Sequence, residues 1–114
     1  MSFNIDMKYD ILFVKCTGRL NIENAIELEE ELKERFQSEI NYIIFNLKDV
    51  EYISSSGIRV LVSSLKKVQD SNGILVLSEV SDPVMGVLKL VGLQDKFVYT
   101  NSDQEAIEYI NERK

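Results

Sequence analysis

The sequence contains no histidine, no tryptophan, one cysteine and one proline in 114 residues. Because imidazole is the usual catalytic base and transition-metal ligand near neutral pH, a Ser-His-Asp hydrolase and a His-ligated zinc enzyme are excluded. A single cysteine can form neither an intrachain disulfide nor a cysteine-paired metal site. Cys16 follows the apolar run 11–14, where a small buried thiol fits. We therefore expect no metal, no cofactor and no enzymatic activity.

Long apolar segments and excess positive charge are also missing. No apolar run approaches the roughly 18 residues of a membrane span, and the N-terminal segment lacks the basic-then-apolar pattern of a signal peptide. Lys and Arg total 13 against 19 Asp and Glu, giving a net charge of −6 that opposes capture of nucleic acid or anionic lipid. We therefore expect a cytoplasmic protein without a direct nucleic-acid partner and without membrane insertion.

The apolar residues that are present, 45% of the chain, are enough for one domain over residues 1–114. Period-two alternation around the Tyr9-Asp10 turn predicts an opening hairpin that runs to Gly18, and Asn21 is placed to cap the helix that follows. The periodicity then predicts helices at 22–37 and 58–68, strands at 42–47, 74–77 and 97–99, a helix that is capped by Asp82 and ends at Gly92, and a last helix opened by the capping box 102–105. Such alternation indicates an α/β fold with a mixed, mostly parallel sheet of about four to five strands and about four helices.

The most distinctive local feature is the cluster Ser54-Ser55-Ser56-Gly57, which lies between the buried strand and an amphipathic helix. The carboxyl end of a parallel strand is where an open α/β sheet usually binds its ligand, and a helix N-terminus attracts anions. A serine before a helix is also an ordinary cap that contributes roughly 1 kcal/mol. The local pattern leaves both interpretations open.

The run from Asp49 to Leu61, which contains this cluster, resembles the phosphorylation loop of the STAS domain family, named for sulfate transporters and anti-sigma factor antagonists. The turn 18–21 is similar to the family's Gly-x-Leu-Asp turn, and the segment 88–93 is similar to its late helix with a Gly-Leu exit. The resemblance covers nearly the whole chain, and the motifs occur in the family's order.

The resemblance implies that the chain is a free-standing bacterial anti-sigma factor antagonist. In such proteins the residue before the glycine, here Ser56, is phosphorylated by an anti-sigma factor that is also a serine kinase. The unmodified protein would bind the anti-sigma factor and so free a sigma factor for transcription, phosphorylation would break the complex, and a serine phosphatase would restore it. The expected partner-binding residues are Asn21, Ser54, Ser55, Gly57 and Arg59.

Two positions depart from the family pattern. Ser54 and Asn21 stand where many members carry aspartate, which removes two carboxylates from the neighbourhood of the acceptor. These departures favour an alternative, a STAS interaction or scaffold module of a signalling complex that is never phosphorylated. Arg59, three positions after Ser56, either pairs with a phosphate or covers the first turn as a solvated side chain.

Overall fold

The chain opens with an antiparallel hairpin of β1 (Ser2–Lys8) and β2 (Ile11–Leu20) in the computed structural model, which describes residues 2–114. The two turn residues, Tyr9 and Asp10, have φ angles of 54° and 60°. Positive φ at both central residues is what a two-residue type I′ turn requires, and its twist matches that of the flanking strands. The predicted opening hairpin is confirmed.

The remaining strands are all parallel to β2 and lie in chain order, so the five-stranded sheet runs β1-β2-β3-β4-β5. A helix connects each parallel strand to the next, as in repeated βαβ units. The elements after β2 are α1 (Ile22–Arg35), β3 (Tyr42–Ile53), α2 (Ser55–Asp70), β4 (Ile74–Ser78), α3 (Asp82–Leu90), a 3-10 turn η1 (Gln94–Lys96), β5 (Val98–Thr100) and α4 (Asp103–Arg113). This architecture confirms the predicted mixed, mostly parallel α/β fold.

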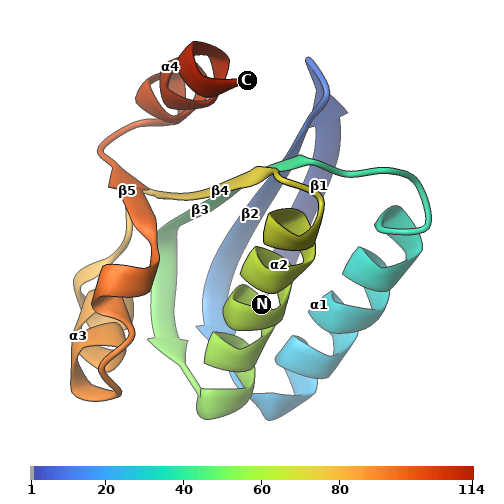
Figure 1. The fold of residues 1–114 in the computed structure, drawn as a ribbon. Coiled ribbons are helices and arrows are strands. Elements are labelled where there is room, and N and C mark those ends of the chain that lie inside the picture. Colours follow the sequence, from blue (N-terminus) through green and yellow to red (C-terminus); the bar gives the residue numbers. More distant parts are fainter. Residues whose placement is uncertain (1) are drawn as a thin grey trace.

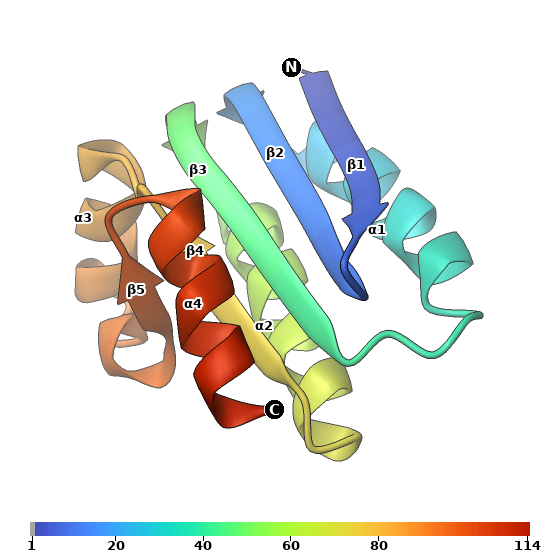
Figure 2. The ribbon, with the colours of Figure 1, turned by 90° about the horizontal axis from the view of Figure 1, so that it is seen from above.

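The helices are divided unequally between the two faces of the sheet. Helices α1, α2 and α3 cover one face and enclose the larger core, which centres on buried side chains such as Phe45 and Leu61. Helix α4 lies alone on the other face over the β3–β5 side and covers a smaller cluster around Ile44 and Ile110, which includes Ile11 at the start of β2. Strand β1 and the later part of β2 stay uncovered there (Figure 2). In the views of Figures 1 and 2, α1 and α2 run side by side in the same direction.

Several predicted boundaries are wrong by a few residues. The first helix ends at Arg35 instead of 37, and β2 continues beyond Gly18, whose φ of 104° accompanies a register shift against β3. Strand β3 is longer than the apolar run 42–47, because Val50 and Ile53 are also buried and the strand stays paired with β2 up to Ile53.

The predicted cap of the third helix is also wrong. Ser81 is the N-cap residue and Asp82 is the first residue of α3, with Pro83 in the first turn. The Ser81 hydroxyl makes no capping hydrogen bond. It donates to the carbonyl of Val50 at 2.7 Å and so ties the start of α3 to β3. None of the helices within residues 2–114 is long and apolar enough to cross a membrane.

Candidate functional site

The serine cluster starts helix α2, and its members have different structural roles. Ser54 is the N-cap: its backbone is extended and its Oγ accepts a hydrogen bond from the Gly57 N–H at 3.2 Å. Ser55 and Ser56 are the first two helical residues, and Ser55 is exposed. Capping therefore belongs to Ser54, and within residues 2–114 the hydroxyl of Ser56 makes no hydrogen bond.

Gly57 allows the start of α2 to pack closely against the ends of two strands. A Cβ atom at this position would lie 2.7 Å from Cγ1 of Ile53 and 2.9 Å from Cγ of Leu20. Both distances are shorter than van der Waals contact between carbon atoms. The absence of a side chain at Gly57 thus determines how closely the start of α2 approaches the strands. Gly57 itself is buried, whereas Ser56, the residue before it, stays partly exposed.

Helix α1 begins beside this cluster with a similar cap. Asn21 accepts a hydrogen bond from the Asn24 N–H through its Oδ1 at 3.0 Å. The carbonyl of Leu20 accepts from the Ser54 N–H at 2.9 Å, which holds the two capping residues next to each other. Two helix N-termini, each with positive dipole character, are therefore brought together at one end of the sheet.

A hollow of about 120 Å³ lies between the starts of α1 and α2. Ser56 and Arg59 line it from α2, while Ile22 and Ile26 line it from α1. The two isoleucines are 58% and 55% exposed, although large aliphatic side chains are usually buried. The hollow thus joins a free hydroxyl, a guanidinium group and exposed apolar surface.

The structure brings some of the predicted site residues together and separates others. Ser56 and Arg59 share the hollow, and Ser54 and Gly57 form the cap of α2. Ser55 is exposed and does not line the hollow. Asn21 does not line the hollow and acts as the cap of α1.

Sequence reasoning missed the two exposed isoleucines. Ile22 and Ile26 are four residues apart and fall outside the helix stripe formed by Ala25, Leu28 and Leu32, which are the buried residues of α1. A second apolar row on a surface helix was the signal that could have identified them.

Arg19 lies at the same end of the sheet and is held by an aromatic ring. Its guanidinium carbon is 4.4 Å from the centroid of the Tyr52 ring, within the range of a cation–π contact. The neighbouring Arg19 carbonyl accepts from the side chain of Asn24 at 2.8 Å. The contact with Tyr52 holds the Arg19 guanidinium at the end of the sheet that carries the serine cluster, where it adds a positive charge to that of Arg59.

Cys16 lies away from this surface in the larger core and is fully buried. Burial raises the pKa of its thiol to about 12. The thiol is therefore neutral at physiological pH, and a neutral buried thiol is a poor nucleophile and metal ligand. Its expected structural role is confirmed by its position.

The STAS domain family matches residues 2–106 of the chain. The chain is 32% identical over 100 residues to BtrV of Bordetella bronchiseptica, a candidate anti-sigma factor antagonist, with 87% of this chain and 86% of the relative covered. It is also 32% identical over 97 residues to the anti-sigma-B factor antagonist of Staphylococcus aureus, with 83% and 90% covered.

Solved structures show the same fold. A crystal structure of a candidate anti-sigma factor antagonist from Thermotoga maritima has a TM-score of 0.89 at 28% identity and covers 96% of this chain and 94% of that one. SpoIIAA in its unphosphorylated form, at 19% identity, has a TM-score of 0.85 with 97% of both chains covered. Anti-sigma factor antagonists are regulators and not enzymes, in agreement with the prediction that the chain is not an enzyme. With its family match and these relatives, the chain belongs to the STAS domain family.

Proposed function

We propose that this chain is an anti-sigma factor antagonist that binds an anti-sigma factor while the Ser56 hydroxyl is free and releases it once Ser56 is phosphorylated. The relatives at 32% identity support the class of function. The observation that carries the switch is the division of roles in the serine cluster: Ser54 caps α2, so the partly exposed Ser56 hydroxyl is not needed for the fold.

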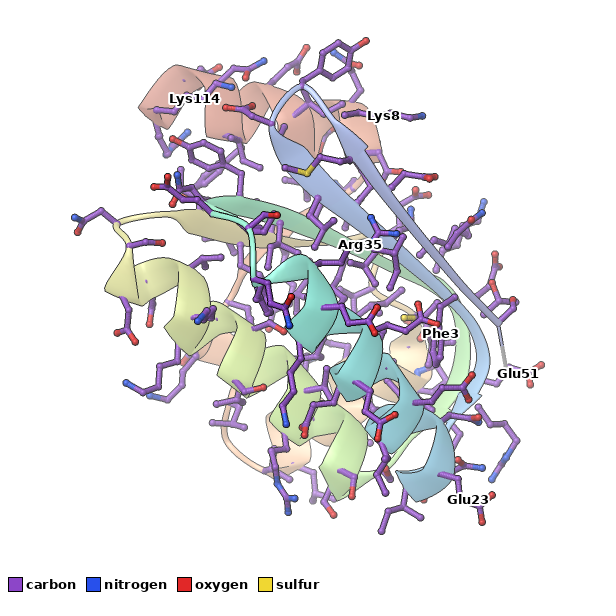
Figure 3. All side chains as sticks on the ribbon, turned by 90° about the vertical axis from the view of Figure 1, so that its right-hand side faces the viewer. Phe3, Lys8, Glu23, Arg35, Glu51 and Lys114 are labelled. Carbon is purple, nitrogen blue, oxygen red and sulfur yellow. The ribbon has the colours of Figure 1, made fainter. Side chains whose placement is uncertain are left out.

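The docking surface consists of Ile22, Ile26, Ser56 and Arg59, at the adjacent N-terminal ends of α1 and α2; Glu23 marks this end of α1 in Figure 3. Exposed aliphatic side chains around a polar centre favour a protein partner, because contact removes them from water. A partner seated on the isoleucines would also cover Ser56. The state of that hydroxyl then affects the stability of the complex.

Phosphorylation would change this surface in two opposite ways. It adds about −1.5 to −2 charges at neutral pH, which the free chain can accommodate at the N-terminus of α2 and beside Arg59 on the next turn. The same charge would have to be desolvated against the apolar part of the interface, which is costly. A swing from 1:99 to 99:1 between free and bound partner needs roughly 5.5 kcal/mol of differential binding. SpoIIAA in its phosphorylated form has a TM-score of 0.76 to this chain, so the fold is compatible with a phosphorylated protein.

The direct test is incubation of the purified chain with ATP and the kinase-like anti-sigma factor encoded beside it, followed by intact mass and peptide mapping. We expect one phosphate on Ser56 and loss of the complex on size exclusion. Ser56→Ala should stay unphosphorylated and bound, whereas Ser55→Ala, a change at the exposed neighbouring hydroxyl, should still receive one phosphate on Ser56. Ser54→Ala should lose roughly 1 kcal/mol of stability, while Ser56→Ala keeps the wild-type urea midpoint to within about 0.5 kcal/mol.

A phosphate on Ser54 or Ser55 instead of Ser56 would contradict the proposal. A complex that persists without any phosphate would instead support the scaffold module. Asn21 and Ser54 favour that second candidate. Each caps a helix with a neutral side chain, although a carboxylate could cap equally well and would also place a negative charge near Ser56.

A further inference from the structure

A second hollow lies farther along the same pair of helices, at the end remote from Ser56. It has a volume of about 470 Å³ and adjoins the smaller hollow beside Ser56, because Glu29 and Val60 line both hollows. A volume of about 300 to 1,000 Å³ is usual for sites that bind small molecules. The face of the molecule that carries this groove is turned toward the viewer in Figure 3, where α1 and α2 lie in front.

The floor of this groove is apolar. Leu32 of α1 and Val60 of α2 are each 2% exposed, and Phe36 packs against the core from beyond the end of α1. Such a floor provides contact for an alkyl or aryl group and none for a fully polar ligand.

One buried polar side chain lies in this apolar lining. Ser64 is 2% exposed and lines the groove. The adjacent hydroxyl of Ser63 donates to the Val60 carbonyl at 3.2 Å, whereas the Ser64 hydroxyl makes no hydrogen bond in the described part of the chain. Because Ser64 lines the groove, its hydroxyl can donate to a ligand atom there, and that hydrogen bond would be stabilising.

The charge around the groove is opposite to that of the chain as a whole. Its lining includes two lysines, Lys33 and Lys67, against a single carboxylate, Glu29, in a protein of net charge −6. The ammonium nitrogen of Lys67 is 5.9 Å from the centroid of the Phe36 ring, which places this charge over the apolar floor. Ser64 and Lys67 are three residues apart and therefore lie on the same side of α2.

We propose that this groove binds a small amphipathic carboxylate of the medium-chain fatty acid type. The alkyl chain lies on Leu32, Phe36 and Val60, and the carboxylate accepts hydrogen bonds from Lys67 and Ser64 with Lys33 adding a second positive charge. This assignment does not depend on the proposed partner switch, because it concerns the chain alone and residues outside Ser56 and Arg59.

The test is titration of sodium decanoate, below its micelle concentration, into the isotope-labelled full chain, followed by amide chemical shifts. We expect saturable shifts confined to 29–37 and 60–67, with a dissociation constant on the order of 1 mM or lower. The double change Lys33→Gln and Lys67→Gln should weaken binding about tenfold. Lys66→Gln is the matched control, because Lys66 lies on the same helix, pairs with Asp70 and does not line the groove.

One further variant and one further ligand test whether binding requires the groove and the negative charge of the ligand. Ser63→Trp, a change at an exposed position of the groove wall, should abolish binding without altering the core. Decyltrimethylammonium, which has the same chain and the opposite charge, should bind more weakly than decanoate. Equal binding of the two amphiphiles, unchanged affinity in the double variant, or shifts spread over the whole chain would overturn the proposal. Shifts at these residues that depend on protein concentration without ligand, or that only the anti-sigma factor produces, would assign the groove to a second copy or to the protein partner and would likewise overturn it.

Discussion

At the scale of single residues, the two departures from the family pattern fall at equivalent structural positions. Asn21 and Ser54 are the N-caps of α1 and α2, and each accepts a hydrogen bond from the N–H three residues later. Aspartate, asparagine and serine are nearly equivalent as caps. The replacements therefore preserve both helix starts and change only the charge near Ser56.

The close packing around Gly57 predicts how one added methyl group changes the stability of the chain. In Gly57→Ala, the gain in helix propensity of at most about 1 kcal/mol is opposed by overpacking against Ile53 and Leu20, which typically costs about 1 to 3 kcal/mol. We expect a net loss of about 1 kcal/mol in the free energy of unfolding, measured by urea denaturation. Gly86→Ala is the matched control, because this helical glycine of α3 has no atom within 4 Å of the added Cβ, and it should gain about 0.5 to 1 kcal/mol. The same sign of change in both variants would contradict this interpretation.

At the scale of elements, one buried amide connects three segments on the α4 side of the sheet. Asn46 of β3 is 5% exposed, and its Nδ2 donates to Glu79 and to Asp103, each at 2.9 Å. The hydroxyl of Ser78, at the end of β4, also donates to Asp103, at 2.8 Å. Because Asp103 is the first residue of α4, this network determines where that helix starts on the sheet.

Removal of this amide should loosen α4 more than the rest of the molecule. In Asn46→Ala two carboxylates lose a shared donor, and the loss of hydrogen bonds to charged groups should cost about 1 to 3 kcal/mol. Hydrogen exchange should show the largest loss of protection in α4. Asn4→Ala, at an exposed position of β1, is the control and should leave both stability and exchange unchanged. Uniform loss of protection across all helices would argue against a local role for the network.

The sequence predicts the kinds and order of the elements better than the contacts between them. Period-two alternation, the caps at Asn21 and Ser102 and the Tyr9-Asp10 turn are local signals, and the structure confirms each of them. Asn46 interrupts an apolar run without any local sign of its partners, which lie 33 and 57 residues away in the chain. The docking of α4 depends on such long-range pairs and cannot be predicted from periodicity.

The candidate site was predictable to a similar extent. The serine cluster is visible as a strand-to-helix junction, but which serine caps the helix depends on the position where helical geometry begins. The exposed isoleucines lie beside Ser56 only because α1 and α2 are parallel neighbours, so that Ile22 and Ser56 line one hollow. The order of the strands in the sheet, which places those helices side by side, is a property of the whole fold.

At the scale of the whole molecule, the buried thiol of Cys16 couples global unfolding to pH. Burial raises the pKa of this thiol from 9.0 to about 12, so between these pH values the unfolded chain releases a proton that the folded chain keeps. The unfolded state then binds fewer protons, and the free energy of unfolding decreases as pH rises. The contribution is fully present below pH 9 and is lost progressively above it.

We therefore expect the wild type to lose about 1 to 2 kcal/mol of stability between pH 8 and pH 10 through this thiol alone. The five tyrosines of the chain also begin to titrate in this range, so the measurement is a comparison of urea midpoints with Cys16→Ala, which contains the same tyrosines. The variant should be less stable at pH 8, because the side chain it truncates is fully buried, but it should lose less stability on going to pH 10. Parallel pH profiles for the two proteins would show that the thiol ionises in the folded state as readily as in the unfolded one, and would contradict its burial in the core.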